Sequence, residues 1–172
     1  MTSHKCCERC WHSPERPCPD YVNCFSQGPR CHADPGCTDK THTRVGELRR
    51  ESLSRPAIFI GTGTCGLGAG ADKTLAAIRD YVSTKGLQAD VIEVGCIGLC
   101  TAEPMVDIQL PGKARVSFGK VTSDKVTGLL DSMLGAGKVP FEQVNYQFRT
   151  TTLQPFEGVL FQDQHPFFAP QT

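Results

Sequence analysis

The chain has 172 residues, of which 39% are hydrophobic, enough apolar material for one packed domain. Lysine and arginine number 18, as do aspartate and glutamate, so the formal net charge is zero. This balance argues against a nucleic-acid partner, because such proteins usually carry a basic excess. No apolar run approaches the roughly 20 residues that cross a bilayer, and the N-terminus lacks the apolar core of an export signal. We therefore expect a cytoplasmic protein without direct membrane insertion, either free or peripheral to a membrane-bound complex.

The ten cysteines are unevenly distributed, and seven of them lie in the first 37 residues. Thiols in a chain without an export signal stay reduced, so cysteine clusters there indicate metal ligands or catalysis more often than disulfides. Residues 1–40 have almost no aliphatic side chains and no regular period, which leaves a segment that is either disordered or held by metal. The candidate ligands in this segment are Cys7, Cys10, Cys18, Cys24, Cys31 and Cys37, with Cys6 as a spare.

The C-x2-C spacing of Cys7 and Cys10 is typical of a knuckle that offers two thiolates to one metal. Zinc accepts mixed cysteine and histidine sets, and the ferredoxin run C-x2-C-x2-C is absent, so the pattern favours zinc over an iron–sulfur cluster. Zinc, an iron–sulfur cluster and a segment without metal all remain alternatives for residues 1–40. A polar linker over residues 41–56 follows, and Pro56 stops any helix there.

Residues 57–137 predict a compact α/β unit with the order β-α-β-β-β-α. Short apolar runs predict strands over residues 57–60, 90–94, 105–110 and 114–118. Apolar spacing of three to four residues predicts a helix over residues 72–85, with Gly86 as its C-cap, and a second helix that begins at Thr122 or Ser123. The helical crossover makes the first two strands parallel, and the Pro111-Gly112 turn makes the last two an antiparallel hairpin.

Residues 138–172 are rich in aromatic side chains but show no clear period. We expect an extended arm that packs either on its own domain or on a partner, because disordered tails are usually poor in aromatic residues. Of these two surfaces we favour that of a partner, so that the arm acts as a docking element.

Three cysteines of the α/β unit predict a shared site. Cys96 and Cys100 bracket a tight turn at Gly98, and Cys65 lies in the Gly-rich loop that follows the first strand. Both loops can lie at the same end of the sheet, so the three thiols are expected to converge. The alternative is that each thiol is a small buried hydrophobe, as free cysteines commonly are.

Three segments carry a family resemblance: IFIGTGTCGLGAGA, VGCIGLCTAEPMVDI and VSFGKVT. Over residues 57–137 the chain resembles the thioredoxin-fold [2Fe-2S] ferredoxin domain. That domain forms the N-terminal part of the NADH- and FMN-binding subunit of bacterial NADH dehydrogenases and of related hydrogenases, formate dehydrogenases and bifurcating complexes. The resemblance implies a thioredoxin-like fold, a [2Fe-2S] cluster on Cys65, Cys96 and Cys100, and a larger FMN- and NADH-binding iron–sulfur subunit as partner.

The chain departs from the family pattern at one ligand. Cluster-bearing members have a C-x4-C pair in the first loop, and the position of its first cysteine is Ile60 here. A [2Fe-2S] cluster normally takes four thiolates. The cluster is therefore lost, or is completed by a ligand from elsewhere such as an N-terminal cysteine or a histidine, or the three thiols do something else.

Two functional classes follow from the sequence. The first is an electron-transfer or docking subunit of an NADH-linked oxidoreductase, which is not catalytic alone because the FMN- and NADH-binding loop of the family is missing. The second is a zinc-stabilised assembly module without redox chemistry.

Overall fold

The computed structural model describes residue 46 and residues 48–171. The chain divides into two compact units, Met1–Ser52 and Leu53–Thr172, and the second holds the fold described below. The six candidate N-terminal ligands lie outside the described residues, so the expectations for residues 1–40 stay predictions. None of the helices in the described stretches is long and apolar enough to cross a membrane.

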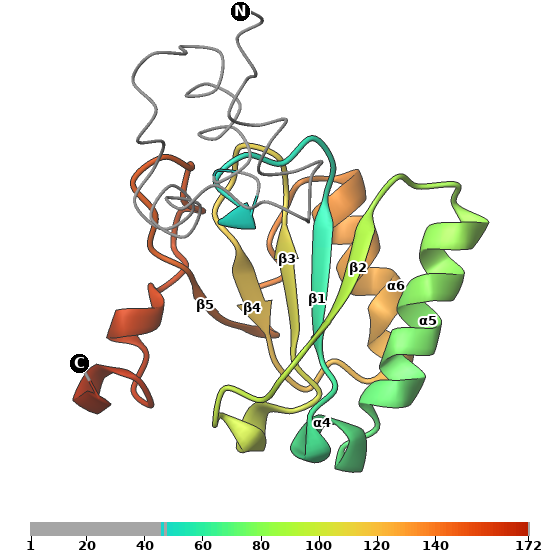
Figure 1. Cartoon of the computed structure of the whole chain (residues 1–172), viewed down its shortest axis with the longest axis horizontal. Helices are drawn as coiled ribbons and strands as arrows, with labels where there is room; N and C mark the ends of the chain where they lie inside the picture. The colour runs from blue at the N-terminus through green and yellow to red at the C-terminus, as the bar shows by residue number, and fades with distance from the viewer. Residues whose placement is uncertain (1–45, 47, 172) are drawn as a thin grey trace, which may run out of the picture. The chain divides into compact units, whose positions relative to one another are not determined.

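Five strands form one mixed sheet in the order β2-β1-β3-β4-β5 (Figure 1). They are β1 (Ala57–Gly61), β2 (Asp90–Val94), β3 (Val106–Gln109), β4 (Val116–Phe118) and β5 (Val144–Gln147). The pair β1 and β2 is parallel and the other neighbours are antiparallel. The predicted parallel pair and the predicted hairpin of β3 and β4 are both confirmed. The predicted α/β class is confirmed as well.

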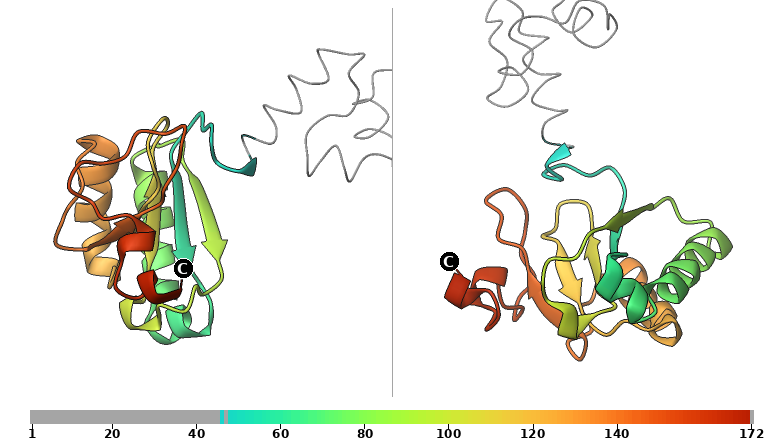
Figure 2. Two further views of the ribbon diagram at one scale, coloured as in Figure 1. Left: turned by 90° about the vertical axis from the view of Figure 1, so that its left-hand side faces the viewer. Right: turned by 60° about the horizontal axis from the view of Figure 1, so that its bottom comes forward.

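The helices α5 (Ala71–Thr84) and α6 (Val126–Leu130) lie on the same side of the sheet (Figure 2). Their apolar faces meet alternate residues of the central strands, such as Ile58 and Ile108, in the main core. Gly86 ends α5 with φ of +61°, as the sequence predicts. The last predicted helix is one continuous segment of three kinds of turn. A 3-10 turn (Ser123–Lys125) precedes α6, and a π turn (Asp131–Gly135) follows it.

The other side of the sheet carries a second, aromatic core. Met105, Leu99 and Tyr146 are buried there, with Phe148, Phe167 and Phe168 packed against them. The segment predicted as an arm thus supplies strand β5 and then continues beside it at the edge of the sheet (Figure 1). Five of its aromatic residues pack in the two cores of this same chain: Tyr146, Phe148, Phe156, Phe167 and Phe168.

Three hydrogen bonds of one buried side chain fasten this segment. The side-chain amide of Gln147 donates from Nε2 to the carbonyl oxygens of Phe156 and Val159 at 2.9 and 2.8 Å. Its Oε1 accepts from the backbone N–H of Phe156 at 2.7 Å. Because Gln147 is only 1% exposed, these three bonds replace water for a buried amide and fix residues 156–159 to the sheet.

An ion pair on the same side holds the start of the segment. The Nε of Arg115 lies 3.2 Å from a carboxylate oxygen of Asp107. The guanidinium group also lies 3.8 Å from the ring centre of Phe148 and 4.7 Å from that of Phe59. Burial raises the pKa of Asp107, and the charge of Arg115 opposes that shift. Arg115 therefore joins strands β1 and β3 to the first aromatic residue after β5.

Candidate metal centre

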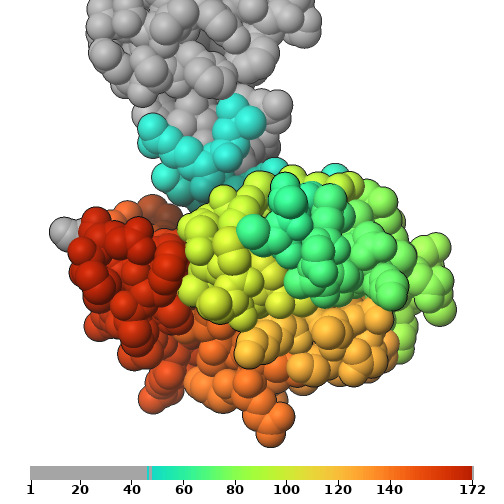
Figure 3. Space-filling view, turned by 90° about the horizontal axis from the view of Figure 1, so that it is seen from below, coloured from blue at the N-terminus to red at the C-terminus, as the bar shows by residue number. Residues whose placement is uncertain are grey.

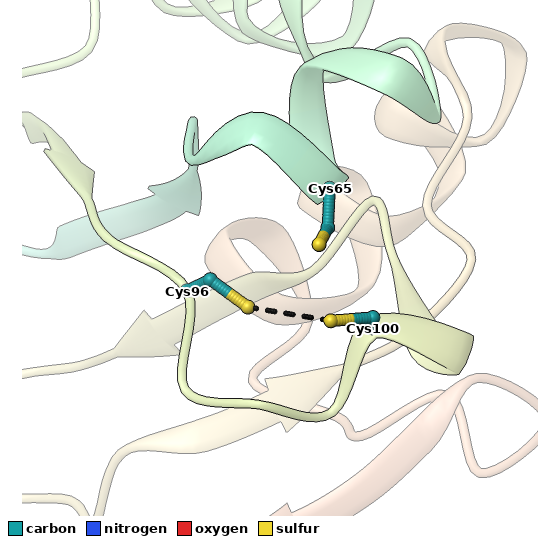
Figure 4. A group of neighbouring side chains, drawn as sticks. All are labelled: Cys65, Cys96 and Cys100. Carbon is teal, nitrogen blue, oxygen red and sulfur yellow. Dashed lines mark hydrogen bonds between the residues drawn. The ribbon is translucent and has the colours of Figure 1, made fainter.

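Cys65, Cys96 and Cys100 come from two loops at one end of the sheet, and their sulfur atoms point toward one another (Figure 4). Cys65 lies in the short helix α4 (Thr64–Gly68), which follows β1. The other two lie in the loop between β2 and β3. All three sulfurs lie within 4.8 Å of one another, which confirms the predicted convergence. All three residues are exposed, so they are not buried hydrophobes.

Glycines allow the two loops to approach this closely. A Cβ atom at Gly66 would collide with the carbonyl oxygen of Gly61, because α4 folds back over the end of β1. A Cβ atom at Gly63 would lie 3.1 Å from the backbone nitrogen of Cys96. The sequence predicts only a Gly-rich loop here. In the structure it forms a helical turn that carries Cys65 to the thiols of the other loop.

The loop of Cys96 and Cys100 has the geometry of a chelating pair. Their sulfurs are 3.6 Å apart. Thiolates about 2.3 Å from one tetrahedral ion stand about 3.8 Å apart, so this pair matches one edge of such a site. The backbone N–H of Gly98 donates to Cys96 Sγ at 3.3 Å, and Gly98 has a φ of +92°. The hydrogen bond with Cys65 raises the pKa of Cys100, while that with Cys96 lowers it, and the net shift is upward.

The position of the missing thiolate is occupied by a core residue. Ile60 is fully buried within β1 and packs in the core on the helix side of the sheet. It therefore neither reaches the thiols nor offers a donor atom. Among the residues that the structure describes, no fourth histidine, cysteine, aspartate or glutamate joins the group. The donor set fits a thiolate-preferring metal or cluster with three ligands, and the fourth must come from outside this trio.

Glu103 lies behind the two loops, at a position for which the sequence predicts no role. Its carboxylate oxygens would lie 3.1 Å from a Cβ atom at Gly61, and Oε2 accepts from the backbone N–H of Met105 at 2.8 Å. Its own backbone N–H donates to the carbonyl oxygen of Cys100 at 3.3 Å. Burial raises the pKa of Glu103, and the Met105 hydrogen bond opposes that shift. Glu103 thus packs the loop that follows Cys100 against the end of β1.

A curated protein is similar to this chain in sequence, and several solved structures are similar to it in fold. No protein-family model matches the chain. It is 34% identical over 110 residues to the NADP-reducing hydrogenase subunit HndB of Solidesulfovibrio fructosivorans, a match that covers 58% of this chain and 86% of that subunit. The chain belongs to the family of this hydrogenase subunit.

Solved structures similar to this chain include a thioredoxin-like [2Fe-2S] ferredoxin from Aquifex aeolicus. One such structure is 16% identical, has a TM-score of 0.49, and covers 57% of this chain and 96% of the ferredoxin. The wild-type ferredoxin in another crystal structure is 17% identical, with a TM-score of 0.47 and coverage of 54% and 97%.

Proposed function

We propose that this chain is an electron-transfer subunit of a multi-subunit oxidoreductase, and that Cys65, Cys96 and Cys100 hold a [2Fe-2S] cluster. The convergence of three exposed thiols from two loops carries the proposal. Membership in the family of a hydrogenase subunit supports the oxidoreductase context. When bound, such a cluster accepts and donates single electrons. The residues of this chain position the thiolates, and the N–H of Gly98 stabilises the charge on Cys96 Sγ.

The fourth ligand in this proposal comes from outside the trio. Candidates are a thiolate among Cys7, Cys10, Cys18, Cys24, Cys31 and Cys37, or a residue of another subunit. A linker from Cys37 to the start of β1 has 20 residues, which reach up to about 66 Å when extended. Distance along the chain is therefore no obstacle. The other N-terminal thiolates would form a zinc site or a second iron–sulfur cluster.

The partner in this proposal is a larger subunit that binds FMN and a pyridine nucleotide. The relative is named for the reduction of NADP, whereas the sequence resemblance points to NADH-linked complexes. The chain would pass electrons within such a complex and would not act on the nucleotide alone. A cytoplasmic location belongs to the same proposal.

Spectra of the anaerobically purified full-length chain test the cluster. We expect visible absorption bands, and an EPR signal after reduction, that disappear in Cys96→Ser and Cys100→Ser. The matched control Cys6→Ser, at the N-terminal cysteine outside the candidate ligand set, should keep both signals. A colourless protein that carries zinc at the trio would contradict the electron-transfer function and favour a zinc-stabilised assembly module.

A further inference from the structure

Two thiols of the metal centre are placed to react with each other. Cys96 and Cys100 lie in one loop, both are exposed, and their sulfur atoms are 3.6 Å apart. We call residues 95–100 the thiol loop. A disulfide bond is about 2.05 Å long, so the two sulfurs need to approach by only about 1.5 Å. Figure 3 shows this loop beside α4 at the surface of the molecule, where a small oxidant in solution reaches it.

The thiol loop can take up this approach. Residues 95–99 belong to no helix or strand, and a Cβ atom at Gly95 would meet nothing within 4 Å. The loop also prepares one sulfur for attack. The backbone N–H of Gly98 donates to Cys96 Sγ at 3.3 Å, and such a donor stabilises the negative charge of a thiolate. Cys96 is therefore the sulfur that reacts first with an oxidant.

We propose that Cys96 and Cys100 form a reversible disulfide in the metal-free chain, and that this bond blocks metal loading. The oxidant is a low-molecular-weight disulfide, such as oxidised glutathione. The Cys96 thiolate attacks one of its sulfurs, which breaks the S–S bond of the oxidant and releases one thiol. Cys100 then gives its proton to water and attacks Cys96 Sγ, which forms the internal bond and releases the second thiol. The two cysteines thus lose two electrons and two protons, and the oxidant leaves as two thiols.

The disulfide and a bound metal exclude each other. The thiolate is the form of cysteine that binds metal, so the bond removes two of the three ligands and leaves Cys65 alone. An excess of reduced thiol reverses the bond and restores the site, since exposed disulfides are the labile ones. Formation of the bond does not depend on which metal the trio holds. Only its control over a [2Fe-2S] cluster rests on the proposed function.

Peptide mapping of the full-length chain tests the bond. The chain is freed of metal with a chelator, reduced, and incubated without oxygen in excess oxidised glutathione, and its remaining thiols are alkylated before digestion. Trypsin cleaves after Lys85 and Lys113, so both cysteines of the thiol loop stay on one peptide, residues 86–113. An internal disulfide lowers the mass of this peptide by two hydrogen atoms and prevents its alkylation. Cys65 lies on another peptide, residues 51–73, so a bond to Cys65 would join two peptides.

We expect the metal-free wild type and Cys65→Ser to form the internal bond at rates within about twofold of each other, because Cys65 takes no part. The double variant Cys65→Ser/Cys100→Ser should stop at a mixed disulfide between Cys96 and glutathione, which raises the mass of the peptide. Prior reconstitution of wild type with ferrous iron and sulfide should slow the bond at least about tenfold, because a cluster occupies both sulfurs.

The outcomes separate this inference from the proposed function. If the metal-free chain forms no internal bond, or joins Cys65 to the peptide instead, the disulfide of Cys96 and Cys100 is overturned and the proposed function stands. If the bond forms equally fast after reconstitution, no cluster occupies the pair. The proposed function then fails at this site, and the control of metal loading fails with it.

Discussion

The ring of Phe167 lies against Gly98. A Cβ atom at Gly98 would be 3.6 Å from Cζ of Phe167, so the C-terminal segment backs the loop that holds Cys96 and Cys100. Phe167 in turn packs edge-on against Phe168 at 4.9 Å between ring centres, and Phe168 packs against Tyr146 at 5.3 Å. A chain of aromatic contacts therefore connects the thiol loop to the buried strand β5.

Phe167→Ala should loosen this loop. The ring is partly buried, so we expect a loss of about 1–2 kcal/mol of folding free energy, below the cost of truncating a fully buried ring. The metal-loaded protein should also lose its metal to a chelator faster than wild type. The matched control is Phe141→Ala, whose ring is 58% exposed and should cost no more than about 0.5 kcal/mol. Equal rates of metal loss in Phe167→Ala and wild type would show that the ring does not support the site.

Gly98→Ala tests the turn itself. With a φ of +92°, an alanine at this position is strained by about 1–2 kcal/mol, and relaxation of the strain would move the N–H away from Cys96 Sγ. We expect lower metal occupancy after purification, measured by elemental analysis. Gly95→Ala is the control in the same loop, because its Cβ would meet nothing within 4 Å. Full occupancy in Gly98→Ala would mean that the positive φ is not needed for chelation.

The sequence predicted the central strands and the long helix because their patterns are strong. All five residues of β1 are buried, which matches a continuous apolar run, and Leu75 and Ile78 of α5 lie on the predicted face. The convergence of the thiols followed from the strand order, since a parallel pair places the loops after β1 and β2 at one end.

The sequence pattern does not reveal strand β5, because a bulge interrupts the alternation of side chains between the two faces of the sheet. Val144 packs in the helix-side core, whereas Tyr146 packs in the aromatic core on the other side. The pairing with β4 shifts register between Ser117 and Phe118, and this shift turns the two side chains to opposite faces. The buried amide of Gln147 also looks like a surface residue in sequence. The sequence does not predict helix α4, because glycine has a low helix propensity. In the folded protein, packing against the end of β1 outweighs that low propensity.

The aromatic segment shows how composition alone can mislead. Its rings carry no period because they cover an edge and one face of a sheet whose contacts come from distant parts of the chain. A deletion of residues 154–172 therefore affects the fold of the domain as well as any contact with a partner. The deletion would remove the partners of Gln147 and uncover Tyr146. We expect this truncation to destabilise the domain itself.

Gln147→Ala measures this anchoring without a deletion. The variant leaves the backbone N–H of Phe156 without its side-chain acceptor and removes two donated bonds from a buried position. We expect a loss of about 2–4 kcal/mol of folding free energy by urea denaturation. Gln154→Ala, which loses an exposed hydrogen bond with Lys113, should cost less than about 1 kcal/mol. Similar losses in the two variants would show that residues 156–159 are not held by Gln147.

Glu103→Gln should change how stability depends on pH. Burial raises the pKa of Glu103 above its ordinary value of 4.5, so the folded protein favours the protonated carboxyl. The stability contributed by this group is fully present below pH 4.5, and it is lost as the pH rises through the higher pKa of the folded state. Glutamine keeps the acceptor for the N–H of Met105 and never ionises, so the variant lacks this loss. Urea midpoints of the metal-free proteins, compared from pH 4 upward, should therefore show wild type losing stability relative to Glu103→Gln as the pH rises. A difference that stays constant across this range, or that runs the other way, would mean that the buried carboxylate is stabilised in its charged form by contacts stronger than the single hydrogen bond from Met105.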